Sequence, residues 1–105
     1  MKVEILDDDI VAGVLEYNGL EYIFCYDSEF LANKDTTAIS VTMPKRKEPY
    51  ISKKLHPFFS SLLSEGNLRD IQSKLLKLDK DDDFAFLIHT AKYDTIGSVR
   101  VGKVL

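Results

Sequence analysis

Three side chains have the chemistry for nucleophilic or acid–base catalysis: Cys25, His56 and His89. A nucleophile needs a base within hydrogen-bond reach, and that base is usually a histidine. Cys25 lies in the apolar run YIFCY, where we expect a buried, inert thiol. His56 immediately precedes a helical pattern, and His89 lies one residue beyond an apolar stripe. We therefore predict no catalytic residue and no enzymatic activity for this chain.

An aspartate-rich stretch in the second half of the chain has some of the spacing of a metal site. Asp79, Asp81 and Asp83 match positions 1, 3 and 5 of an EF-hand calcium loop. That loop also needs glycine at position 6 and glutamate at position 12, where this chain has Phe84 and Thr90. We therefore expect helix capping and no metal. The glycine-rich signatures of nucleotide-binding loops are missing from the sequence, so we expect no cofactor.

A basic stretch in the middle of the chain has the charge to contact phosphates or an acidic protein surface. Residues 1–40 carry two basic and nine acidic side chains, whereas residues 41–80 carry nine basic and four acidic ones. The total formal charge of −3 and the pI near 5.3 argue against a dedicated nucleic-acid-binding protein. A solvated loop and an electrostatic contact with a protein both remain open, and we expect DNA contact to be indirect at most. The residues concerned are Lys45, Arg46, Lys47, Lys53 and Lys54.

Length and cysteine content indicate one small domain in a reducing compartment. The chain has 105 residues, the size of one typical domain, so we assign residues 1–105 to a single domain. One cysteine excludes an intrachain disulfide, which favours the cytoplasm over a secreted scaffold. The N-terminal MKVEILDDD lacks an apolar signal sequence, and no apolar run approaches the roughly 20 residues that cross a bilayer. We therefore expect a cytoplasmic protein with no membrane partner.

The beginning and the end of the chain have the patterns of β-strands. Apolar residues alternate with polar ones, and Asp7 to Asp9 interrupt this alternation as a solvated turn would. Asn18-Gly19 between two apolar runs predicts a hairpin with a type I′ turn, which needs positive φ at both central residues. The predicted strands surround Val3 and Ile5 and then comprise Ile10–Tyr17, Leu20–Tyr26, Ala38–Met43 and Ile96–Leu105.

Before the closing strand the pattern becomes helical. Pro57 suits the first turn of a helix, and Gly66 is placed to end that helix in a left-handed conformation. Asn67 is expected to cap a second helix, and Asp79, with Asp82 three residues on, a third. The order predicts an α+β fold, a small, mostly antiparallel sheet with about three helices inserted before the closing strand. The residues at helical spacing in these three segments are Phe58, Phe59, Leu62, Leu63, Leu68, Ile71, Leu75, Leu78, Phe84, Leu87, Ile88 and Ala91, and the last four are expected to face the core.

Five segments follow one another in an order and spacing that resemble a known family. Each segment is a weak motif by itself, but together they cover about residues 3–101. They resemble the N-terminal subdomain of the HipA-like serine/threonine kinases, and the resemblance implies the fold of that subdomain. The segments are YDSEFL at 26–31, AISVTMP at 38–44, PFFSSLLSEGNLRDI at 57–71, DDDFAFL at 81–87 and IGSVRV at 96–101.

The resemblance also implies a function in trans. In HipA-like kinases this subdomain continues directly into the kinase core, whereas this chain stops at Leu105. In that respect it is similar to the HipS antitoxins of the three-component HipBST toxin–antitoxin systems. The resemblance implies an antitoxin that binds and inhibits a HipT-like serine/threonine kinase toxin, in a larger complex with a HipB-like helix-turn-helix protein. Two alternatives stay open: a non-inhibitory accessory subunit that completes a split HipA-like kinase, and a subunit that aids DNA binding by a HipB-like partner.

The expected kinase contact is the helix–turn–helix from Phe58 to Ile71, with the turn as its tip. Ser64 departs from the family pattern, which often has proline there. Asn67 is small and polar, which argues against one bulky plug at this position. For each leucine of the segment, ordinary core packing is the alternative to partner contact. The candidate contact residues are the anchors Leu62, Leu63 and Leu68, the polar residues Glu65 and Asn67, and Ser64 and Gly66 of the turn.

Overall fold

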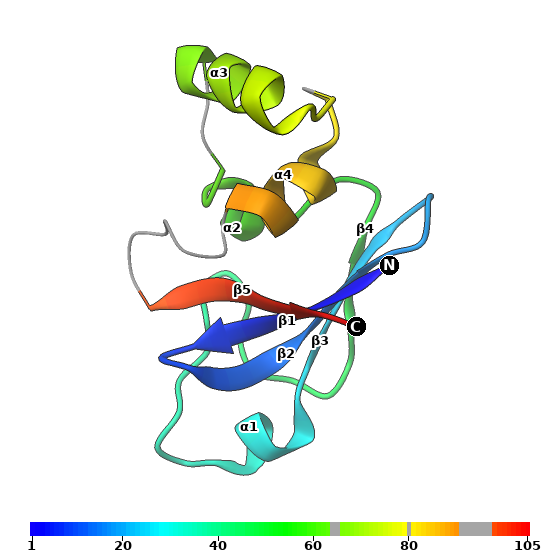
Figure 1. The fold of residues 1–105 in the computed structure, drawn as a ribbon. Helices are drawn as coiled ribbons and strands as arrows, with labels where there is room; N and C mark the ends of the chain where they lie inside the picture. The colour runs from blue at the N-terminus through cyan, green and yellow to red at the C-terminus, as the bar shows by residue number, and fades with distance from the viewer. Residues whose placement is uncertain (64–65, 80, 91–97) are drawn as a thin grey trace.

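The computed structural model describes residues 1–63, 66–79, 81–90 and 98–105. Within these ranges the chain forms a five-stranded antiparallel sheet with the order β4-β3-β2-β1-β5 (Figure 1). Figure 1 also shows α2, α3 and α4 gathered at one side of the sheet and α1 away from them. The predicted α+β class is confirmed. The elements are β1 Lys2–Asp7, β2 Ile10–Tyr17, β3 Tyr22–Tyr26, α1 Ser28–Ala32, β4 Tyr50–Ser52, α2 Pro57–Ser60, α3 Gly66–Leu76, α4 Asp83–Thr90 and β5 Val99–Val104.

Two hairpin turns connect the first three strands. The two-residue turn is at Asp8-Asp9, whereas it was predicted at Asn18-Gly19. Asp8 and Asp9 have φ angles of 49° and 67°, and the residues that flank them, Asp7 and Ile10, pair directly. Positive φ at both central residues is the property of a type I′ turn. The Asn18–Glu21 loop is longer, and its positive φ is at Gly19. The hairpin predicted at Asn18-Gly19 is confirmed, but its two-residue type I′ turn is wrong.

One face of the sheet and the helices α2 and α4 enclose the hydrophobic core. Phe24 of β3 and Phe59 of α2 lie with their ring centroids 5.4 Å apart. Phe86 and Leu87 of α4 are fully buried, because α4 packs on both α2 and β5. Burial of side chains of this size contributes roughly 1.5–3 kcal/mol each, so this layer stabilises most of the fold. The fully buried large side chains are Phe24, Phe30, Phe59, Phe86, Ile5, Leu15, Met43, Leu87, Val3 and Val101.

The opposite face of the sheet carries Cys25, which corrects one prediction. Cys25 pairs with Val14 and is exposed, whereas a buried thiol was expected. Successive side chains of a strand point to opposite faces. Because Phe24 points into the core, Cys25 and Ile23 point away from it. Ile51 of β4 pairs with Ile23 and is 55% exposed on the same face.

The segment predicted as a strand at Ala38–Met43 is an irregular loop with one isolated bridge, between Ser40 and Met43. Its backbone is held by a side chain: the Tyr26 hydroxyl donates to the Met43 carbonyl and accepts from the Ile39 amide. Ile39 and Met43 are buried, whereas Val41, which would share their face in a regular strand, is 96% exposed. The Tyr26 hydroxyl thus hydrogen-bonds to backbone groups that would otherwise pair with a neighbouring strand. Burial raises the pKa of Tyr26.

Two short elements were not expected. Helix α1 begins after Asp27, whose carboxylate accepts hydrogen bonds from the amides of Glu29 and Phe30. This is N-capping by a residue type that strongly favours it. Strand β4 pairs three residues with β3, from Tyr22 opposite Ser52 to Phe24 opposite Tyr50. Both elements are too short to show a hydrophobic period.

The three helices before the closing strand are confirmed, but their predicted boundaries need correction. Gly66 begins α3 instead of ending the helix before it. Asn67 is the second residue of α3 and therefore not its cap. Asp82, not Asp79, caps α4, since its Oδ1 accepts from the Ala85 amide at 3.0 Å. The predicted start of the closing strand at Ile96 and the core residue Ala91 lie outside the described residues.

The helices are short. At 11 residues, α3 is the longest of those described. Such a helix spans about 16 Å, against the roughly 30 Å of a bilayer's hydrocarbon core. Among the described helices none is long and apolar enough to cross a membrane.

Candidate functional site

The leucines predicted to anchor a partner occupy different environments. Leu63 is buried in the core. Leu62, which follows α2, is partly buried and packs against the core. Core packing therefore accounts for these two residues. Leu68 is 54% exposed at the beginning of α3. Of the three leucines, Leu68 alone has the exposure that a contact residue requires.

The turn between α2 and α3 is only partly described. Ser64 and Glu65 lie outside the described residues. Gly66 and Asn67 are placed as the first two residues of α3. The contacts predicted for these four residues therefore stay predictions.

Helix α3 carries a row of exposed apolar side chains, formed by Leu68, Ile71 and Leu75 and called here the α3 row. Their side chains are 54%, 53% and 77% exposed. Residues three and four apart lie on the same face of a helix, so the three form one stripe. The sequence predicted helical spacing for these residues and left partner contact and core packing open for Leu68, and the structure places all three on the surface. Exposed apolar stripes of this kind are typical of helices that pack against another chain.

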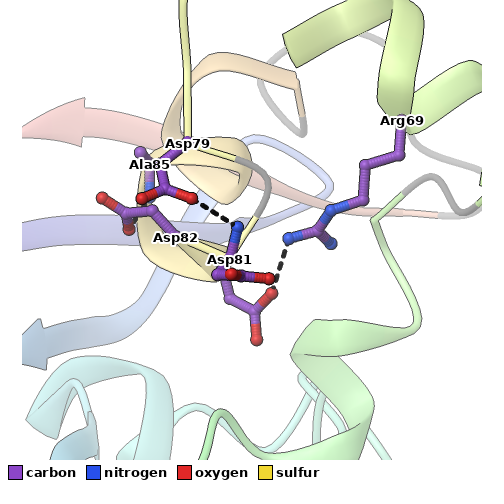
Figure 2. A network of polar contacts seen from close by, with 6 residues as sticks. Arg69, Asp79, Asp81, Asp82 and Ala85 are labelled. Atoms are coloured by element: carbon purple, nitrogen blue, oxygen red, sulfur yellow. Dashed lines mark hydrogen bonds and ion pairs between the residues drawn. The ribbon is translucent and has the colours of Figure 1, made fainter.

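One arginine fixes α3 to α4. Arg69 Nη2 lies 2.8 Å from Asp83 Oδ1, and its guanidinium carbon lies 4.2 Å from the centroid of the Phe86 ring. Figure 2 shows Arg69 reaching from α3 toward the aspartates that precede α4. An ion pair and a cation–π contact from one side chain set the orientation of α3. This contact leaves the α3 row on the surface.

The aspartates before α4 hold the backbone of that region. Asp79 Oδ1 accepts from the Asp81 amide at 2.9 Å, and Asp82 Oδ1 accepts from the Ala85 amide (Figure 2). Asp83 is the partner of Arg69. Over the described ranges, no group of three or more His, Cys, Asp or Glu side chains is placed to hold a metal ion. These carboxylates therefore serve helix capping and helix–helix contact.

The residues of the basic stretch differ in whether they contact other groups of this chain. Lys45 Nζ donates to the carbonyl oxygens of Asn33 and Thr36, at 3.1 and 2.7 Å. Arg46 stacks on the Tyr50 ring, with its guanidinium carbon 3.7 Å from the centroid. Lys45 and Arg46 thus stabilise the loop they belong to, a role that their charge alone did not reveal. The exposed lysines of the stretch are Lys47, Lys53 and Lys54.

The residues considered for catalysis lie on separate elements. His56 caps α2, since its Nδ1 accepts from the Phe58 amide at 3.1 Å. Burial lowers the pKa of His56, because the charged imidazolium loses hydration there. Cys25 lies on β3 and His89 is exposed on α4. The arrangement gives His56 a structural task and places the three side chains on different elements.

The comparison with protein families identifies the class of domain. The family model of the HipA N-terminal domain matches residues 3–102, so the chain belongs to the HipA N-terminal domain family. A solved structure described as the N-terminal domain of HipA toxin shares the fold, with a TM-score of 0.66 and 23% identity. That match covers 97% of this chain and 92% of the solved one. The family and the fold inferred by resemblance are thereby confirmed, and both matches are to the N-terminal domain, not to a kinase catalytic domain.

Two curated relatives show this domain in chains of different length. "Putative kinase Y4mE" of Sinorhizobium fredii is 34% identical over 64 residues, which cover 61% of this chain but 15% of that protein. An uncharacterized protein of Haemophilus influenzae is 26% identical over 89 residues, which cover 85% of this chain and 79% of that protein. The chain therefore spans a small part of the first relative's length and most of the second's.

Proposed function

We propose that this chain is an antitoxin that binds a HipT-like serine/threonine kinase toxin and inhibits it by protein–protein contact. The α3 row is the observation that carries the proposal, because it gives a HipA N-terminal domain an apolar surface fit for a second chain. The Haemophilus relative supports it, since there the domain makes up most of a small protein. The site of action is the cytoplasm, where the kinase acts.

The proposed contact centres on Leu68, Ile71 and Leu75. These side chains enter apolar depressions on the kinase, and water leaves both surfaces. Lys74 and Lys77 are exposed next to the row and form a polar rim. Such a rim adds orientation more than affinity. We expect Ser64, Glu65, Gly66 and Asn67 to extend the contact at the beginning of α3.

Inhibition follows from binding by one of two routes. The chain obstructs the active site of the kinase, or it binds the inactive conformation more tightly and shifts the population toward it. Kinase kinetics separate these routes. Obstruction of the ATP site raises KM for ATP, whereas a shift toward an inactive conformation lowers kcat.

The test of the α3 row uses two isoleucines of equal exposure. Ile71→Asp changes the row, and Ile51→Asp changes the far face of the sheet, where the side chain is 55% exposed against 53% for Ile71. Binding to a HipT-like kinase is measured by calorimetry. We expect Ile71→Asp to weaken binding at least tenfold, the effect of losing an interface anchor, and Ile51→Asp to leave it unchanged. Equal effects of the two substitutions would refute the α3 row as the contact.

Inhibition is tested separately from binding. Autophosphorylation of the kinase is measured with and without this chain, and we expect it to fall as the complex forms. A rise in autophosphorylation would refute the antitoxin function and support the accessory-subunit alternative. Ile71→Asp serves as the control, because a variant that does not bind should not change kinase activity.

In the proposed complex a HipB-like helix-turn-helix protein contacts DNA, and this chain contacts DNA at most indirectly. The internal hydrogen bonds of Lys45 support this, because they occupy the cation. Substitution of the exposed Lys47, Lys53 and Lys54 by glutamine should leave operator binding of the complex unchanged. These lysines would instead contact phosphates if the substituted complex bound the operator more weakly and its affinity depended less steeply on salt than that of the unsubstituted complex.

A further inference from the structure

A groove separate from the α3 row lies between α4 and the end of the sheet. It has a volume of about 440 Å³, and its apolar lining comes from α4 and from the strand ends. Phe84 and Ile88 form one wall, and Tyr17, Val104 and Met1 form the other. Figure 1 shows α4 next to the region where both termini lie. The groove admits one long side chain together with part of its backbone.

The groove is on a different side of α4 from α3. Phe84 and Ile88 line it, whereas Asp83 and Phe86 contact Arg69 of α3. One turn of a helix takes 3.6 residues, so these two pairs point in different directions. A ligand in the groove therefore leaves the α3 row free.

A carboxylate lies at the rim of this apolar groove. Asp82 lines the groove and uses Oδ1 to cap α4 by accepting from the Ala85 amide. In the described part of the chain, Asp82 Oδ2 makes no hydrogen bond. The negative charge also reaches the aromatic wall: the pKa of Tyr22, which stacks on Tyr17, is raised by burial and further by Tyr17, Asp83 and Asp82.

Among the described residues that line the groove, Met1 carries a cationic amino group. The amino group of Met1 donates to the Tyr17 carbonyl at 3.1 Å, and His89 lies on the lining. The Met1 amine is therefore directed at a backbone oxygen, and Asp82 Oδ2 remains available to a cation. An apolar trough that ends at a carboxylate matches a side chain with an apolar stem and a cationic head.

We propose that this groove binds an arginine side chain within an otherwise apolar peptide segment of a partner protein. The methylene stem lies along Phe84 and Ile88. The guanidinium stacks on the Tyr17 ring and donates to Asp82. This surface is independent of the proposed kinase inhibition, because α4 presents it away from α3.

The test uses a defined peptide, acetyl-Ala-Leu-Arg-Leu-Ala-amide, and the same peptide with citrulline in place of arginine. Citrulline keeps the shape of the side chain and removes its charge. Binding to the full chain is followed by the amide NMR resonances, without an N-terminal tag because Met1 lines the groove. We expect saturable shifts at Tyr17, Ala85 and Ile88. The citrulline peptide should bind about two- to fivefold more weakly, as expected for loss of an exposed ion pair.

Two matched variants assign the charge. Asp82→Asn keeps a side chain that caps helices well and removes the carboxylate, so it should make the two peptides bind equally. Asp81→Asn removes a neighbouring exposed charge outside the groove and should preserve the preference for arginine. Equal binding of both peptides to the unsubstituted chain, shifts confined to other surfaces, or no saturable binding would each overturn the proposal.

Discussion

Helices α3 and α4 are neighbours with similar apolar spacing, yet they place their apolar side chains differently. In α4, Phe86 and Leu87 are fully buried against the sheet and α2. In α3, Ile71 and Leu75 are 53% and 77% exposed. Helical periodicity therefore shows that a helix has an apolar face, but it does not show which surface packs against that face. In α4 the covering surface is the chain's own sheet, and for α3 we propose a second protein.

The largest expected effect is on stability, and it compares the same leucine-to-alanine substitution in α4 and in α3. Leu87→Ala removes a fully buried side chain and leaves a cavity beneath α4. We expect it to lower the free energy of unfolding by about 2–5 kcal/mol. Urea denaturation followed by circular dichroism measures this loss. A loss below about 1 kcal/mol would show that α4 is not part of the cooperative core.

The next effect concerns the connection between the two helices. Arg69→Met keeps much of the apolar stem and removes both the ion pair to Asp83 and the charge over the Phe86 ring. We expect a loss of about 1–2 kcal/mol. The control is Arg100→Met, which breaks an ion pair to Asp9 on more exposed side chains, 36% and 79% against 18% and 42%. The control should cost less than about 0.5 kcal/mol, and equal losses would contradict a special role for Arg69.

The free energy of unfolding is expected to depend on pH through His56, the N-cap of α2. The folded pKa of His56 is lowered from 6.5, so the folded protein binds this proton less readily than the unfolded chain. The stabilisation is complete above pH 6.5 and is lost as pH falls through the folded pKa. Loss of the N-cap limits the effect to about 1 kcal/mol. His56→Asn caps without titrating, so its unfolding free energy should lack this component, and an unchanged pH dependence would contradict the assignment.

The smallest expected effect is on the exposed side of α3. Leu75→Ala removes a side chain that is 77% exposed and improves helix propensity slightly. We expect the free energy of unfolding to change by less than about 0.5 kcal/mol, measured in the same urea titration as Leu87→Ala. A large loss of stability would mean that α3 packs its apolar row within the chain, which would remove the basis of the comparison.

The strands with strong local signals could be predicted from the sequence. Ile10–Tyr17 is β2 with the predicted bounds, and the turn at Asp7 to Asp9 is present. The strand predicted at Ala38–Met43 failed for a physical reason: alternation shows the ability to form a strand, but pairing needs a free neighbour. In the folded chain the Tyr26 hydroxyl takes the carbonyl of Met43 and the amide of Ile39.

The candidate site was harder to predict than the fold. Leu68 was expected both as a core residue and as a contact residue, because a single helical pattern supports both. Its exposure depends on how α3 is oriented against α4, and the Arg69–Asp83 pair, which joins residues 14 apart in the sequence, fixes that orientation. The internal role of Lys45 likewise depends on loop carbonyls that come together on folding. Local patterns carry no information on such contacts.

The pairing of β1 with β5 has a consequence for how the chain is made. Val3 lies opposite Val104, and the Leu105 amide donates to the Lys2 carbonyl at 2.8 Å. On the ribosome β1 emerges before the other strands of the sheet, and its partner β5 emerges after them. The hairpins of β1, β2 and β3 can form during translation before β5 is available to pair with β1. Until then β1 has an open edge, so slow translation of the helices lengthens the time in which nascent chains are prone to mispair.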